Sequence, residues 1–188
     1  MRAHFTIFID ACVLVPPSVC NLYLSLAEAY LFQPRWSEEV LREVHRTHVL
    51  KMGWSDELAD YWQSEVRKAF PEALVDGYQL VAGACTNDPK DRHVVAAAYH
   101  SRSDAIITSN LKHFPAESLT PFHLTVHSPA DYLCTMLDMS PGLVIRVLTD
   151  IASMRKKTLR EQLNSYPPEM AGFVQKVIQV SGMDAPDC

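Results

Sequence analysis

The pattern of hydrophobic and polar positions changes period along the first half of the chain. Residues 4–9 alternate and are rich in β-branched and aromatic side chains, which predicts a strand that ends at Asp10. Apolar residues then recur every three or four positions through residues 18–31, which is the spacing of a helix. Two further short runs, residues 104–108 and 124–126, are typical of buried strands, so strands and helices alternate along the chain.

Polar residues at the expected helix starts support this order of elements. Ser37 is a good N-cap for a helix that runs to about Lys51, and two glutamates follow it in the first turn, where the helix dipole favours carboxylates. Ser55 begins a helix that ends at Phe70, and residues 91–99 indicate a helix with a small-residue face. Strands that alternate with helices predict an α/β fold of three layers, α/β/α, with a central, mainly parallel sheet.

The strand pattern stops in the last quarter of the chain. Helices are predicted over residues 143–163 and 169–180, with a break at the Tyr-Pro-Pro sequence of residues 166–168. We therefore expect an α/β domain at residues 1–138 and a C-terminal helical extension at residues 139–188. The apolar faces of the extension have two open interpretations: they pack on a partner protein, or they dock back onto the domain.

The composition is that of a soluble globular protein. Of 188 residues, 48% are hydrophobic and 21% are charged, which argues against disorder as the main state. No apolar run approaches the roughly 20 residues that span a bilayer. No cleavage-site pattern follows the N-terminal apolar stretch. We therefore expect a cytoplasmic protein with no membrane association.

Charge and cysteine content limit how the protein could bind a polyanion and which cysteine-based sites it could contain. The net charge of −5 is unusual for a protein that binds nucleic acid through bulk electrostatics, so a polyanion would have to be engaged locally or through metal ions. The five cysteines are odd in number and include no C-x-x-C pair. This pattern argues against both a disulfide framework and a thiolate zinc site.

Polar residues at predicted strand ends are the strongest candidates for chemistry. Asp10 ends the first strand, and Asn110 follows the strand at 104–108. Asp91 begins a helix with Asp88 just before it, and Glu43 lies off the apolar face of its helix. Ligands of open α/β sheets bind beyond the carboxyl ends of the strands, where these groups would meet. Carboxylates without thiols suit Mg²⁺ or Mn²⁺, and such ions could activate water against a phosphodiester. The sequence contains no G-x-S-x-G, H-E-x-x-H or P-loop motif that would indicate a different catalytic chemistry.

Each candidate also has a plain structural interpretation. Asp10 could terminate strand pairing or cap a turn, and Asp91 could be an N-cap. Asp88 could be a turn residue beside a proline, and Glu43 could be a solvated residue paired with Arg46 or with the neighbouring Arg42. Taken one at a time, these interpretations are the better ones. The chemical hypothesis depends on the residues meeting in space.

Four blocks of sequence, in this order, resemble a known family. Residues 9–14 and 34–43 resemble the opening of a PIN domain, and residues 88–98 and 106–114 resemble its second half. The best match is the bacterial VapC-like group, within it a subgroup with a C-terminal helical extension. The resemblance implies a PIN-like α/β/α fold and Mg²⁺- or Mn²⁺-dependent endoribonuclease activity, often as the toxin of a type II toxin–antitoxin pair. It also implies an RNA substrate, an antitoxin partner and a homodimer.

The resemblance assigns roles to individual residues. Asp10, Glu43 and Asp91 match the three core acidic positions, which implies that they are catalytic metal ligands. Asn110 falls at the fourth metal-binding position, where the family often has Asp and sometimes Asn, and a neutral amide holds a cation less tightly. Thr108 matches the family's hydroxyl residue near the same site. The implied mechanism is hydrolysis by metal ions on these carboxylates, with Asn110 and Thr108 orienting water.

Basic residues flank two of the site blocks. Lys90, Arg92 and Lys112 could contact RNA phosphates, or they could balance the nearby carboxylates. The dense basic run of residues 155–157 is expected on the solvated face of a helix in the extension. Two other functions stay open: a metal-dependent nuclease that acts on DNA or flaps, and a catalytically degenerate RNA-binding or regulatory module.

Overall fold

A five-stranded parallel sheet forms the centre of the protein. The computed structural model describes residues 5–183. The strand order is β3-β2-β1-β4-β5, so β1 is the middle strand and the chain crosses it after β3. The strands are β1 (Thr6–Ile9), β2 (Gln33–Ser37), β3 (Leu74–Val75), β4 (Ala105–Ile107) and β5 (Thr125–His127).

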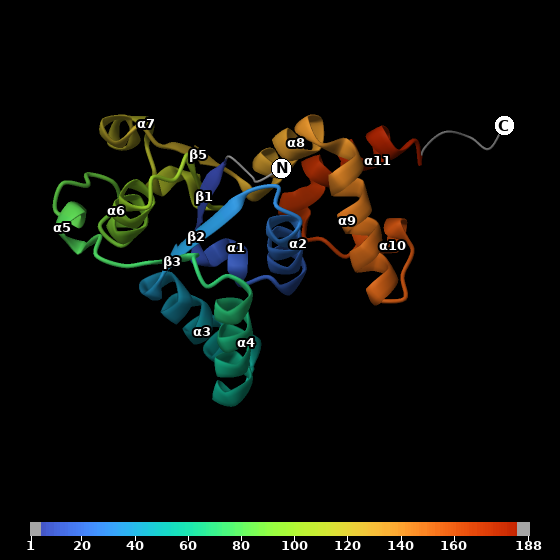
Figure 1. Cartoon of the computed structure of the whole chain (residues 1–188), viewed down its shortest axis with the longest axis horizontal. Coiled ribbons are helices and arrows are strands. Elements are labelled where there is room, and N and C mark those ends of the chain that lie inside the picture. Colours follow the sequence, from blue (N-terminus) through green and yellow to red (C-terminus); the bar gives the residue numbers. More distant parts are fainter. Residues whose placement is uncertain (1–4, 184–188) are drawn as a thin grey trace.

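Helices cover both faces of this sheet, which confirms the predicted three-layer α/β/α fold. In Figure 1, α5, α6 and α7 lie on one side of the strands, and α2, α8 and α9 lie on the other. The α-helices are α1 (Ala11–Leu14), α2 (Pro17–Glu28), α3 (Glu38–Met52), α4 (Asp56–Ala69), α5 (Gln79–Ala82), α6 (Arg92–His100), α7 (Ala116–Leu119), α8 (Pro129–Met139), α9 (Pro141–Met154), α10 (Leu159–Leu163) and α11 (Ala171–Ser181). Short 3-10 turns span Leu111–His113, Thr120–Phe122 and Pro168–Met170.

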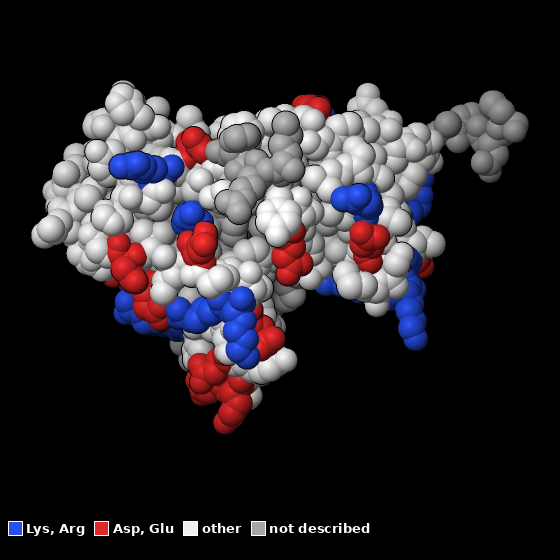
Figure 2. All heavy atoms as spheres, in the orientation of Figure 1, with Lys and Arg blue, Asp and Glu red and all other residues white. Residues whose placement is uncertain are grey.

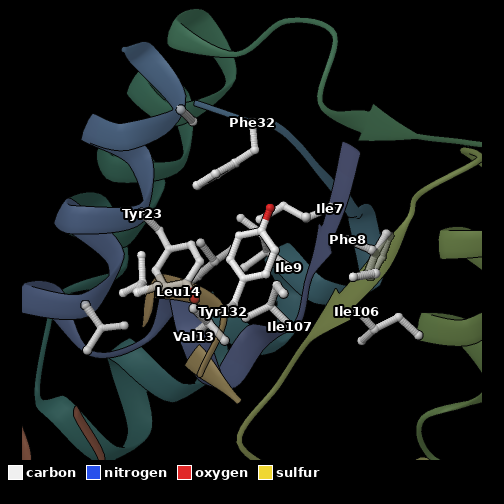
Figure 3. Packing of buried hydrophobic residues seen from close by; sticks show 14 of the residues in the cluster. Ile7, Phe8, Ile9, Val13, Leu14, Tyr23, Phe32, Ile106, Ile107 and Tyr132 are labelled. Carbon is white, nitrogen blue, oxygen red and sulfur yellow. The ribbon is translucent and has the colours of Figure 1, made fainter. Parts of the chain in front are cut away.

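The middle strands are buried on both faces, as a parallel sheet requires. Figure 3 shows Ile7 and Ile9 of β1 directed toward Tyr23 and Tyr132, whereas Phe8 points to the opposite side of the sheet. All three β1 side chains are fully buried. This burial fixes the register, because a slip of one residue would exchange the two faces. The carboxyl end of β1 is therefore placed firmly against its neighbours.

Strand β2 lacks the usual sequence pattern and is not predicted from it, because Pro34 interrupts the run. The structure explains how the proline is accommodated. The N–H of Gln33 donates to the carbonyl of Phe5 on the β1 side (2.8 Å), and the N–H of Trp36 donates to Ala73 on the β3 side (3.0 Å). The backbone nitrogen of Pro34, which carries no hydrogen, also points to the β3 side. Strand β3 pairs with β2 only from Trp36 onward, so within residues 5–183 no strand partner faces that nitrogen. No ladder bond is lost, as expected where proline occurs in sheets.

The C-terminal helices dock back onto the α/β layers. Helix α9 packs against α2 and α8, and α11 packs against α8. Leu148 and Phe173, from α9 and α11, are fully buried and belong to the same hydrophobic core as the sheet. Lys176 of α11 forms an ion pair with Asp138 of α8. The C-terminal extension therefore packs on the rest of the chain. The domain boundary at residue 138 stays a prediction.

The predicted continuous helix at residues 143–163 is wrong, because the chain turns between α9 and α10. Lys156 has a positive φ of 54°, which ends the helix. Thr158 and Glu161 then form a capping box that begins α10. The basic run at residues 155–157 therefore lies in a turn and not on a helix face. Across residues 5–183, no helix is long and apolar enough to cross a membrane.

Candidate active site at the carboxyl edge of the sheet

Asp10 is buried at the end of the middle strand. Its side chain is 3% exposed. One carboxylate oxygen accepts the N–H of Ala11 at 2.7 Å, and the other accepts the hydroxyl of Thr108 at 2.6 Å. Thr108 directly follows β4, whose Ile107 pairs with Ile9, so parallel pairing brings the two side chains together. Asp10 does cap α1, as its plain interpretation predicts, but it also belongs to a cluster from two strands.

The environment of Asp10 disfavours its charge. Burial is the largest effect and raises the pKa of the carboxyl above its ordinary value of 3.8. Hydrogen bonds from Thr108, Cys12 and Ala11 act in the opposite direction, and the negative charge of Asp91 raises the pKa further. A nearby cation would relieve both the burial cost and the repulsion. The oxygen donors and this shortage of positive charge fit a hard divalent ion.

Cys12 is a site residue that the sequence reasoning missed. Its Sγ lies 3.2 Å from Oδ2 of Asp10 and 3.4 Å from Oγ1 of Thr108, and it accepts the N–H of Ser109 at 3.2 Å. Burial, followed by the charge of Asp10, raises the pKa of this thiol to about 12. Cys12 is therefore a neutral thiol that donates to the carboxylate. The sequence signal that could have identified Cys12 is its position two residues after Asp10.

The Cys12 thiol should react slowly with alkylating reagents. A rise in pKa from 9.0 to about 12 lowers the thiolate fraction at pH 8 by roughly a thousandfold, and the thiolate is the nucleophile. We expect iodoacetamide to label Cys12 at least roughly a hundredfold more slowly in the folded protein than in the protein unfolded in guanidinium. Peptide mass spectrometry over time measures the two rates. Equal rates would show that the thiol is not held against Asp10.

Asp91 is held by a histidine. It occupies the N-cap position of α6, but its side chain makes no capping hydrogen bond. Instead, Oδ2 lies 2.6 Å from Nδ1 of His113. Asp88 adds a third group, and one donor atom from each of the three residues lies within 4.8 Å of the others, so the set could hold a metal ion. Asp88 also accepts the N–H of Lys90 at 3.0 Å, which shapes the turn.

Glu43 faces the site from α3 through a histidine on α6. Nε2 of His93 lies 3.2 Å from Oε1 of Glu43, and Nδ1 lies 3.7 Å from Oε2 of Glu39. Burial alone would lower the pKa of His93, but Glu43, Glu39 and Asp10 together raise it. The ionic partner of Glu43 is therefore His93 and not Arg46. The negative charge of Asp10 also raises the pKa of His93, so the pair lies within electrostatic range of the buried carboxylate.

Asn110 joins the cluster through its backbone. Its N–H donates to Oγ1 of Thr108 at 3.0 Å, and its side chain is exposed. The structure thus brings Asp10, Thr108 and Asp91 to one edge, connects Glu43 through His93, and places the Asn110 backbone alongside. Whether these residues bind a metal or catalyse a reaction stays a prediction.

The basic residues near the site differ in exposure. Lys90 and Lys112 are exposed, whereas Arg92 is half-buried and its Nε donates to the carbonyl of Asn87 at 3.4 Å. Arg92 therefore has a structural contact of its own.

Figure 2 shows that Asp and Glu gather at the free end of the α3–α4 pair, where α4 begins with Asp56 and Glu57.

The fold and this edge define a class of protein: a parallel α/β domain with carboxylates gathered beyond the strand ends. A stretch of 67 residues is 43% identical to a Mycobacterium tuberculosis protein named "Putative ribonuclease VapC50". This similarity confirms the predicted resemblance to VapC-like ribonucleases. It covers 36% of this chain and 40% of that protein, so the chain spans less than half of its relative. No protein-family model and no solved structure matches the chain significantly.

Proposed function

We propose that this protein is a VapC-like PIN-domain endoribonuclease that depends on Mg²⁺ or Mn²⁺. The observation that carries the proposal is Asp10, a carboxylate buried at a strand end beside a second carboxylate, Asp91. A buried charge of this kind is costly unless a cation offsets it. The similarity to a VapC ribonuclease supports the same activity.

The four groups that would hold the metal are Asp10, Glu43, Asp91 and Asn110. When bound, a divalent ion activates water and neutralises the charge that develops on a phosphodiester. The protein's own part is orientation. The Thr108 hydroxyl and the Ala11 N–H fix both oxygens of Asp10.

The substrate and partners follow from the same proposal. Lys90 and Lys112 are exposed beside the carboxylates and would contact RNA phosphates, with a smaller part for Arg92. We propose that the protein acts in the cytoplasm as the toxin of a type II toxin–antitoxin pair, is restrained by an antitoxin protein, and forms a homodimer. Metal ions that bridge carboxylates to phosphates would let a chain with a net charge of −5 bind a polyanion.

Cleavage of total cellular RNA tests the proposal. The purified protein is incubated with RNA and Mn²⁺, with and without EDTA, and the fragment ends are mapped. Discrete fragments that require the metal would support a selective endoribonuclease. Cleavage of DNA flaps in place of RNA, or Mn²⁺ binding without cleavage, would contradict it, as would intact RNA from a protein free of bound inhibitor.

Restoring a carboxylate at residue 110 should strengthen metal binding. Asn110→Asp adds a negative charge at the edge of the sheet that carries Asp10 and Asp91, and an anionic oxygen holds a cation more tightly than an amide does. We expect the Kd for Mn²⁺ to fall by roughly threefold to tenfold, with activity retained. Calorimetric titration measures the change. Weaker binding together with lost activity would show that the amide has a specific role.

A further inference from the structure

Glu43 differs from the other carboxylates of the site in how freely it can move. Asp10 is buried and Asp91 is mostly covered, but the side chain of Glu43 is 50% exposed. Holding a glutamate side chain in one rotamer costs conformational entropy. Among residues 5–183, the one ionic partner within reach of its carboxylate is His93, 3.2 Å away. A group that directs Glu43 toward the site would offset this entropy cost, and His93 is in place to do so.

His93 is itself mostly buried, which restricts how its ring can move. Its side chain is 16% exposed, and the next two residues of α6 are fully buried. Its second ring nitrogen, Nδ1, is buried and makes no hydrogen bond within the described residues; it lies 3.7 Å from Glu39, which accepts a hydrogen bond from the hydroxyl of Tyr78. The imidazole therefore stands between two glutamates of α3, with one nitrogen toward each. Because the ring is mostly buried at this place, its Nε2 is directed at Glu43.

The position of His93 in α6 links it to a second site carboxylate. Asp91 is the N-cap of this helix, and its carbonyl accepts the N–H groups of Val94 and Val95, so Asp91 and His93 belong to the same turn. Asp91 is itself one of the site carboxylates, whereas His93 contacts Glu43 on α3. One helical turn therefore sets the position of a carboxylate on its own helix and of another on the neighbouring helix.

We infer that His93 is a positioning residue that holds the Glu43 carboxylate against the site and so couples the α3 carboxylate to the α6 carboxylate. This inference rests on the proposed function, since Glu43 would be a metal ligand. Groups that orient metal ligands typically account for ten- to hundredfold in metal affinity. An ion pair that only stabilises the fold would leave metal affinity unchanged.

Two amide substitutions separate these roles. The amide nitrogen of Gln can take the place of Nε2 and reach Glu43, whereas Asn is one methylene shorter and cannot. We expect His93→Asn to raise the Kd for Mn²⁺ about tenfold or more, and His93→Gln to raise it by less than about threefold. Electron paramagnetic resonance of free Mn²⁺ in titrations of the full-length protein measures both values. RNA cleavage by His93→Asn should recover at saturating Mn²⁺, so the loss appears in metal affinity and not in the maximal rate.

A double-mutant cycle tests whether His93 acts through Glu43. In a Glu43→Gln background, His93→Asn should change the Kd for Mn²⁺ by less than about twofold, because the group it positions is already lost. Equal Kd values for His93→Asn, His93→Gln and the wild type would overturn the inference while leaving the proposed function standing. An undiminished effect in the Glu43→Gln background would also overturn it. If the wild type binds no Mn²⁺, the proposed function itself fails.

Discussion

Replacement of Asp10 by Asn should abolish RNA cleavage and leave the protein folded. The substitution removes one negative charge from the proposed metal site but keeps the shape of the side chain. An amide oxygen can still accept the N–H of Ala11, which the carboxylate now binds at 2.7 Å. We expect the cleavage rate in Mn²⁺ to fall by at least roughly a thousandfold. Fragment yield over time, at equal protein concentration, measures the loss.

The same substitution should not destabilise the metal-free protein. The pKa of Asp10 is raised in the folded state, so stability falls as the pH rises from the unfolded pKa through the folded pKa, and the full cost is present above both values. Asn removes that cost. At pH 7.5 in EDTA, the Tm of Asp10→Asn should therefore equal or exceed that of the wild type. The stabilisation by Mn²⁺ should disappear in the variant. Full cleavage activity in Asp10→Asn would contradict the assignment of the site.

Deletion of residues 139–188 should prevent the formation of a stable domain. The deletion uncovers the faces of α2 and α8 on which α9 and α11 pack. Leu148 and Phe173 are fully buried in the common core, and burial of each such side chain contributes about 1.5–3 kcal/mol. Since whole domains are stable by only about 5–15 kcal/mol, we expect the shortened chain to aggregate or to lose its cooperative thermal transition. Size-exclusion chromatography and near-UV circular dichroism measure the outcome.

A pair of point substitutions in the full-length chain provides the control. Phe173→Ala should cost about 3–5 kcal/mol of unfolding free energy, because it leaves a cavity in the core. Gln179→Ala, on the exposed side of the same helix, should change the unfolding free energy by less than about 0.5 kcal/mol. Urea unfolding of the two variants compares them directly. A shortened chain that unfolds as cooperatively as the wild type would show that residues 1–138 form an independent domain.

Much of the sheet and its helices was predictable because local signals and burial agree there. Alternating and continuous apolar runs marked β1, β4 and β5, and serine N-caps marked the starts of α3 and α4. Strand β2 was missed because Pro34 breaks the strand signal, and only the short length of β3 makes the proline acceptable. The turn between α9 and α10 was missed although the Thr158–Glu161 capping box is visible in the sequence.

The carboxylates of the site were predictable, but their partners were not. A residue at a strand end is visible in one sequence, because strand ends follow from local patterns. The pairing of His93 with Glu43 joins residues on two helices, 50 positions apart, and the contact of His113 with Asp91 joins positions 22 apart. Local periodicity contains no information about such contacts. Cys12 shows the same limit, since its contact with Thr108 depends on how β1 and β4 pair.

The hydrogen bond between Thr108 and Asp10 has a consequence for how the protein is made. It joins residues 98 positions apart, and the strands that bring them together are neighbours in the sheet but distant in the chain. Pairing between such distant strands is slow and requires most of the domain to be available. A nascent chain that has not yet emerged past β4 therefore lacks the assembled site. The proposed ribonuclease activity therefore requires that β4 has been synthesised and has paired with β1.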